Sequence, residues 1–184
     1  MPDPTDYAKL DDPGFIATRS FAPLRVHGQQ PRDGRARAGS YARADLGPEP
    51  AAAAQARRLT RDTLARWDMQ HLTDDAEAIA SELASNAISA ATPARGNLPA
   101  IIFAIHRRPD ELRIIVWDNG PSGPMRKAHG PDDETGRGLA IIDYLTGRNW
   151  GWWPTPQSGG KVVWAALAAP ATSAQPDSTR DRAC

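Results

Sequence analysis

Cysteine is almost absent from this chain, because the only cysteine among its 184 residues is Cys184. The chain can therefore form neither an intrachain disulfide nor a cysteine-based metal cluster, and a reducing cytoplasm is the expected compartment. Residues Met1 to Asp6 are acidic, whereas a signal peptide begins with basic residues. No stretch approaches about 18 apolar residues, the length at which a membrane helix is expected. We predict a cytoplasmic protein without a membrane segment.

An excess of charge of either sign is also missing. The chain has 22 basic and 22 acidic residues, so no global field attracts it to nucleic acid or to an anionic membrane. A locally basic stretch runs from Arg25 to Arg43, but Tyr41 is its only aromatic residue, which gives little support to base stacking. A solvated linker is the favoured interpretation of this stretch, and a partner-binding arm is the alternative. We predict no direct contact with nucleic acid.

Sustained periodicity is lacking at both ends of the chain. Proline, glycine, aspartate and arginine dominate residues 1–48, where neither helical nor strand periodicity persists. We predict a poorly ordered arm over residues 1–48, one folded domain over 49–168 and a disordered polar tail over 169–184. A domain of about 120 residues is long enough to bury most of its apolar surface.

The central part of the chain predicts the element order α-α-β-β-loop-α-β-β. Helical periodicity covers residues 56–68, 74–91 and 139–145, and Asp74 with Glu77 is a candidate capping box for the second helix. Strand alternation covers two hairpins, residues 99–106 with 112–117 and residues 149–153 with 161–167. This order predicts an α/β two-layer sandwich, with a mixed, mainly antiparallel sheet and helices on one face. The Gly-x-x-x-x-Gly-Lys-Ser/Thr loop of P-loop NTPases is absent from the sequence.

The second helical segment carries a carboxylate and a carboxamide four positions apart. At about 3.6 residues per turn, its apolar residues form one stripe, made of Ala76, Ile79, Leu83, Ala87 and Ala90. Glu82 and Asn86 fall together on one edge of that stripe, where a charge costs free energy unless it is paired. A metal ion and phosphates would supply such a partner. The alternative is an ordinary solvated edge of the helix.

A second candidate group lies where an apolar strand ends. Asp118 follows the run Ile114 to Trp117 and precedes Asn119 and Gly120. A carboxylate fixed at a strand end is a strong acceptor for an amino group such as that of adenine. Gly120 would let a flat ring approach the backbone closely. The alternative interpretation of Asp-Asn-Gly is a simple turn.

A third candidate group is a pair of glycines before a helix. Gly136 and Gly138 flank Arg137, and a helical segment begins at Leu139. Backbone N–H groups at a helix N-terminus bind phosphate, and Arg137 could add a charged contact. A Gly-x-Gly pair in front of a helix is also frequent without any ligand.

These motifs, in this order, resemble the ATP-binding domain shared by gyrase, the Hsp90 chaperones, histidine kinases and MutL. Within that superfamily the chain is most similar to the anti-sigma-factor serine kinases, especially the small actinobacterial regulators. The segment from Gly159 to Ala165 also looks like their final strand. The resemblance covers roughly residues 51 to 168.

The resemblance implies ATP and Mg²⁺ as cofactors. It implies that Asn86 holds Mg²⁺ together with the ATP phosphates, and that Glu82 is the general base for a seryl hydroxyl or for water. The rest of the implied ATP site consists of Asp118, Gly120, Gly136, Arg137, Gly138 and Leu139. The implied partners are a sigma factor, its antagonist protein, or both, and a homodimer is left open.

The chain departs from this family at three places. Ser89-Ala90-Ala91 stands where relatives commonly have Arg-His-Ala, Val162 stands where the final strand often has Thr, and Pro121 and Pro124 interrupt the glycines after Asp118. Intact Glu82 favours an ATP-dependent protein serine/threonine kinase. The departures favour a non-catalytic, nucleotide-responsive module that works by binding a partner. Residues 121–135 hold few apolar side chains and are expected to form a lid over the nucleotide.

Overall fold

The computed structural model describes residues 25–27, 40–92, 100–124, 138–156 and 159–169. Its helices are α2 (Ala51–Arg66), α3 (Thr73–Ala90) and α4 (Gly138–Thr146), with the 3-10 turn η2 (Gln70–Leu72) before α3. Its strands are β1 (Arg25–His27), β2 (Tyr41–Leu46), β3 (Ile101–Arg107), β4 (Glu111–Asp118), β5 (Trp150–Pro154) and β6 (Lys161–Ala168). Within these residues, no helix is long and apolar enough to span a bilayer.

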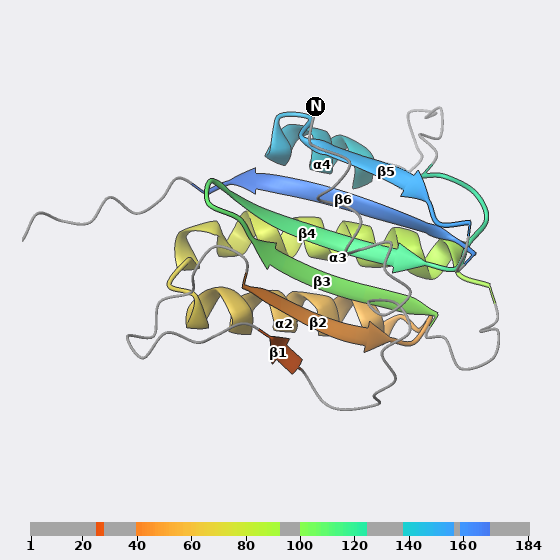
Figure 1. The fold of residues 1–184 in the computed structure, drawn as a ribbon, viewed down its shortest axis with the longest axis horizontal. Coiled ribbons are helices and arrows are strands. Elements are labelled where there is room, and N and C mark those ends of the chain that lie inside the picture. Colours follow the sequence, from red (N-terminus) through yellow and green to blue (C-terminus); the bar gives the residue numbers. More distant parts are fainter. Residues whose placement is uncertain (1–24, 28–39, 93–99, 125–137, 157–158, 170–184) are drawn as a thin grey trace, which may run out of the picture.

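The strands form one six-stranded sheet in the order β1-β2-β3-β4-β6-β5. Helices α2 and α3 run side by side across one face of this sheet, and α4 lies at its β5–β6 end (Figure 1). The predicted two-layer α/β sandwich is confirmed. The sheet was expected to be mixed and mainly antiparallel, and all the strand pairs described are antiparallel. Both predicted hairpins, β3–β4 and β5–β6, are present.

The core lies between the helices and the sheet. In α3 the buried residues include Ala76, Ile79, Leu83 and Ala87, which are at most 2% exposed. These are four of the five residues in the predicted stripe, and the fifth, Ala90, is half-buried at the helix end. Several of the buried helical side chains are alanines, so the helices can approach the sheet closely. The periodicity of the sequence therefore identified the buried face of α3.

The opposite face of the sheet is apolar as well. Ile102, Ile115, Trp117, Val162 and Trp164 form a second cluster there, and Trp153 packs against it. Arg113 lies over the ring of Trp164, 4.4 Å from the ring centroid. Because both faces of β3, β4 and β6 are buried, these strands read as nearly continuous apolar runs in the sequence.

The arm predicted over residues 1–48 is wrong for two segments, because residues 25–27 form β1 and residues 41–46 form β2, which pairs with it. This strand pairs with β3 along its whole length, from Tyr41 opposite His106 to Leu46 opposite Ile101. Its inward residue Ala42 is fully buried. Alanine carries little hydrophobic signal, and the hydrogen bonds to β3 come from a segment far along the chain, so the strand was missed. Residues 1–24, 28–39 and 170–184 lie outside the described residues.

The predicted capping box of α3 is also wrong. The N-cap position is Leu72, and no side chain caps the helix, because η2 leads directly into Thr73. Glu77 does not reach back to the helix start. It accepts a hydrogen bond from Nη2 of Arg61 on α2 at 2.7 Å, which ties the two helices together on the solvent side.

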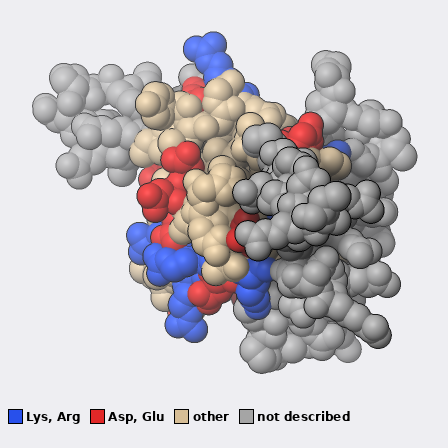
Figure 2. All heavy atoms as spheres, turned by 90° about the vertical axis from the view of Figure 1, so that its left-hand side faces the viewer, with Lys and Arg blue, Asp and Glu red and all other residues tan. Residues whose placement is uncertain are grey.

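Charged side chains of both signs are interspersed over the described part of the face shown in Figure 2. A surface of that kind creates no extended field of one sign, in keeping with the zero net charge of the chain.

Leu83 anchors α3 to the sheet, so its truncation should be costly. We expect Leu83→Ala to lower the free energy of unfolding by about 2–5 kcal/mol, because a cavity is left in the core. Ile141→Ala is the matched control, because Ile141 is 38% exposed on α4. Denaturant unfolding monitored by tryptophan fluorescence measures both values, and equal losses for the two variants would contradict this account of the core.

Candidate functional site

Glu82 and Asn86 lie on one edge of α3, as the spacing predicts. Leu83 and Ala87, next to them in the sequence, are buried against the sheet. Glu82 is half-buried and Asn86 is exposed. The packing of the apolar stripe thus fixes where the carboxylate and the carboxamide can point.

The carboxylate of Glu82 lies against the first residue of α4. A Cβ placed on Gly138 would collide with Oε2 of Glu82, and the carboxyl carbon would be only 3.3 Å away. Glycine at this position therefore permits the contact between α3 and α4. The N-terminus of a helix carries partial positive charge, so it is a favourable place for an anion. The predicted base and the predicted phosphate-binding helix start are side by side.

Asp118 ends β4 and is almost completely buried, with 1% of its surface exposed. Its Oδ1 accepts a hydrogen bond from the backbone N–H of Gly120 at 2.9 Å and from Nζ of Lys161 at 2.7 Å. Burial raises the pKa of the Asp118 carboxyl above its ordinary value, while Lys161 and the Gly120 N–H offset part of that rise. Both of these hydrogen bonds end on Oδ1, so Oδ2 receives neither.

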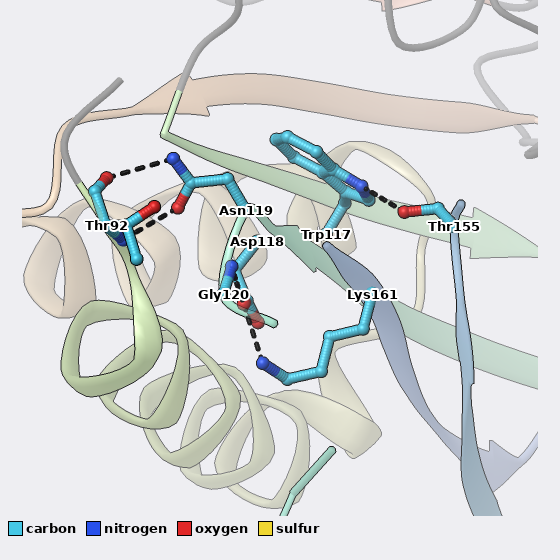
Figure 3. A network of polar contacts seen from close by, with 7 residues as sticks. All are labelled: Thr92, Trp117, Asp118, Asn119, Gly120, Thr155 and Lys161. Atoms are coloured by element: carbon cyan, nitrogen blue, oxygen red, sulfur yellow. Dashed lines mark hydrogen bonds and ion pairs between the residues drawn. The ribbon is translucent and has the colours of Figure 1, made fainter. Parts of the chain in front are cut away.

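The end of α3 is tied to the end of β4. Asn119 accepts a hydrogen bond from the backbone N–H of Thr92 and donates one to its carbonyl oxygen, each at 2.9 Å (Figure 3). A Cβ on Gly120 would collide with the carbonyl oxygen of Ala90, the C-terminal residue of α3. These contacts hold Asp118 at a fixed position beside the last turn of the helix.

Successive turns of α3 connect the two ends of the site. Glu82, Asn86 and Ala90 follow one another at intervals of four residues, so they form a row along one edge of the helix. The row spans about 12 Å, at 1.5 Å per residue. Gly138 lies at its Glu82 end and Gly120 at its Ala90 end. Asn86 is therefore placed between the carboxylate of Glu82 and the end of β4.

The remaining predicted site residues fall into two groups. Gly136 and Arg137 lie outside the described residues. Leu139 is 6% exposed and belongs to the core, so its side chain anchors the start of α4. Most of the predicted lid also lies outside the described residues. Its described beginning includes Gly123, where an added Cβ would be 2.5 Å from the ring of Trp152 on β5.

Two residues that hold the site together were not singled out from the sequence. Lys161 is the cross-strand partner of Asp118 in the β4–β6 register, and Asn119 joins the end of α3 to the end of β4. Lys161 had one usable signal, because it is a lysine at the head of an otherwise apolar strand. Asn119 had none, because an asparagine before glycine is common in turns.

The departure at Val162 does not concern the site. Val162 packs with Trp117 and Trp164 on the face of the sheet opposite the helices, whereas Asp118 and Lys161 lie on the helix side. A hydroxyl group at position 162 would not reach Asp118 across the sheet. This departure therefore carries no weight against nucleotide binding.

Comparison with known families agrees with this arrangement. The profile of the histidine kinase-like ATPase domain matches residues 46–161, which is more than half of the chain. The chain belongs to this family, and its folded part is an ATP-binding domain of the histidine kinase-like type. No curated protein matches the sequence at a significant level.

Gly120 should be intolerant of any side chain. We expect Gly120→Ala to lower the free energy of unfolding by about 1–3 kcal/mol, because the new Cβ meets the Ala90 carbonyl and lies 2.8 Å from Oδ1 of Asp118. Gly47→Ala is the control, because the atoms nearest to its Cβ belong to the side chain of Glu49, the nearest of them at 3.4 Å. Thermal unfolding of both variants checks this, and a fully stable Gly120→Ala protein would show that the backbone here is less confined than described.

Proposed function

We propose that this protein is an ATP- and Mg²⁺-dependent serine/threonine kinase that phosphorylates a protein antagonist in a partner-switching pathway, and that a sigma factor is its other partner. The observation that carries the proposal is the contact of the Glu82 carboxylate with Gly138 at the start of α4. It puts a proton acceptor beside the helix N-terminus where phosphate would bind.

The residues present fit ATP. At one end of the α3 row, Oδ2 of the buried Asp118 carboxylate takes neither the hydrogen bond of Gly120 nor that of Lys161, so it can accept from the adenine amino group. At the other end, Gly138 has no side chain, and the start of α4 where phosphate would bind lies beside the Glu82 carboxylate.

Mg²⁺ fits through the side chain of Asn86. A carboxamide oxygen is a ligand that Mg²⁺ accepts, and Mg²⁺ usually keeps several waters while it bridges phosphates. Among the described residues, no group of three or more His, Cys, Asp or Glu side chains forms a metal site. Asn86 would then hold the ion together with the phosphates, which neutralises charge at the transferred group.

In the proposed kinase, Glu82 accepts the proton of the attacking seryl hydroxyl at Oε2. Glu82 is half-buried, and its Oε2 lies against Gly138 at the start of α4, which keeps this oxygen within the proposed site. Asn86 and the α4 N-terminus orient the phosphates, and Asp118 with Gly120 orients the base. These residues supply position and charge, which are the main contributions of a protein to phosphoryl transfer.

A second candidate function is a non-catalytic module that binds its partner in response to nucleotide. The observation that favours it is the pairing of Asp118 with Lys161, because an acceptor already paired with an ammonium group is weaker toward adenine. Exposed Tyr144, at 84%, and Trp152, at 46%, offer apolar surface to a partner. Measurements on Asp118 and Glu82 separate the two functions.

Asp118 should govern ATP affinity. We expect Asp118→Asn to weaken ATP binding by about 1.5–3 kcal/mol, the usual worth of a hydrogen bond to a charged group. Isothermal titration with ATP and Mg²⁺ measures the loss. Asp45→Asn is the control, because Asp45 pairs with Arg43 on β2. Equal ATP affinity in wild type and Asp118→Asn would remove Asp118 from the site.

Substitution of Glu82 should change the rate of phosphoryl transfer, whereas substitution of Asn86 should also change ATP affinity. We expect Glu82→Gln to leave ATP affinity nearly unchanged while phosphoryl transfer falls by roughly 10²–10⁴, because a positioned general base is lost. Asn86→Ala should lose Mg²⁺-dependent binding and turnover together. Transfer of labelled γ-phosphate to a candidate antagonist protein gives the rate, and titration gives the affinity.

The matched control for Glu82→Gln is Glu77→Gln, on the same helix but paired with Arg61 at the solvent side. If wild type binds ATP, labels no antagonist, and captures its partner equally well with Gln at position 82, the kinase proposal fails and the binding module stands.

A further inference from the structure

The buried partner of Asp118 is a lysine, and the register of the sheet explains why. Lys161 begins β6 and lies directly opposite Asp118 in the β4–β6 pair. Both side chains are on the helix side, and they are 4% and 1% exposed. The distance from Nζ of Lys161 to Oδ1 of Asp118 is 2.7 Å (Figure 3).

Burial removes an ammonium group from water at a cost in free energy, and each N–H donor that makes no hydrogen bond adds to that cost. A lysine ammonium has three N–H donors. Within the part of the chain that the structure describes, Lys161 donates to Asp118 alone. On the partner, Oδ1 takes the hydrogen bonds of Lys161 and Gly120, whereas Oδ2 takes neither. The pair therefore offers a ligand an acceptor oxygen and N–H donors side by side.

The two classes of purine differ at the edge that such a pair would meet. Adenine presents an amino donor at position 6 and an acceptor at N1, whereas guanine and hypoxanthine present the O6 acceptor and an N1–H donor. A lone buried carboxylate offers only acceptors, so it would face O6 with like charge and leave it unpaired. Lys161 removes this conflict, because it can donate to O6 while Oδ2 of Asp118 accepts from N1–H.

We infer that Lys161 is a specificity-determining residue that extends the base site to 6-oxopurine nucleotides, so that the protein binds inosine and guanosine triphosphates as well as ATP. This inference rests on the proposed nucleotide site and concerns only its base-binding end. Lys161 does not contact Glu82 in the row along α3, so it selects the base and leaves the phosphate end unchanged.

The test compares the dissociation constants of ATP, ITP and GTP, with Mg²⁺, for wild type and Lys161→Met. ITP is the decisive probe, because it lacks the 2-amino group and so isolates the O6/N1 edge. In wild type we expect ITP to bind within about 10-fold of ATP. In Lys161→Met the ratio of the ITP to the ATP dissociation constant should rise by about 10- to 100-fold, because O6 is then buried without a donor.

Arg113→Met is the matched control, because it removes a cation of similar burial from the opposite face of the sheet. Its ITP to ATP ratio should equal that of wild type, and thermal unfolding shows whether each variant is folded. If Lys161→Met fails to fold, the ratio of the ITP to the ATP dissociation constant in wild type tests the inference by itself. Wild type that binds ATP but binds ITP more than 100-fold more weakly overturns the inference and leaves the proposed function intact.

A parallel change in ATP and ITP affinity on Lys161→Met would also overturn the inference, since Lys161 would then merely support Asp118. Absence of binding for all three nucleotides would instead reject the proposed nucleotide function itself.

Discussion

The packing of α3 against the sheet is the contact on which the rest of the structure depends. Its buried stripe sets the rotation of the helix, so one edge carries Glu82, which lies against the start of α4, and Asn86 one turn further along. Alanines within the stripe let the helix approach the sheet closely. Rotation of α3 by one residue, about 100°, would turn both polar side chains away from the site. The position of these two candidate functional groups is thus fixed by apolar burial.

Two carboxylates in this domain have opposite environments, which suits them to opposite tasks. Asp118 is buried, paired with Lys161 and held by a backbone N–H, so its position is fixed, as its proposed role in binding the base requires. Glu82 is half-buried at a helix N-terminus, in close contact with a glycine that has no side chain to displace it. A group that moves a proton must exchange partners during the reaction, whereas a group that orients a ligand must not.

Features that repeat with a short period could be predicted from the sequence. The sequence predicts most elements near their observed positions, namely helices α2, α3 and α4 and strands β3 to β6. Their buried residues recur in the sequence with the period of a helix or of a strand. The position of Glu82 and Asn86 on one edge of α3 could be predicted, because a spacing of four depends on a single helix. Strand β2 was missed, because Ala42 gives little signal and its partner is distant in sequence. The Lys161–Asp118 pair depends on the β4–β6 register, and a slip of one residue would have put Lys161 on the other face.

The pairing of β2 with β3 also bears on how the chain folds. Their partners are more than fifty positions apart in the sequence, with two helices between them, whereas β3 and β4 are joined by a short turn. Closing a long loop costs more chain entropy than forming a hairpin, and contacts between distant segments slow folding. During synthesis β2 leaves the ribosome well before β3. We expect the β3–β4 hairpin to form early, and the β2 edge to complete the sheet late, after its partner strand has been made.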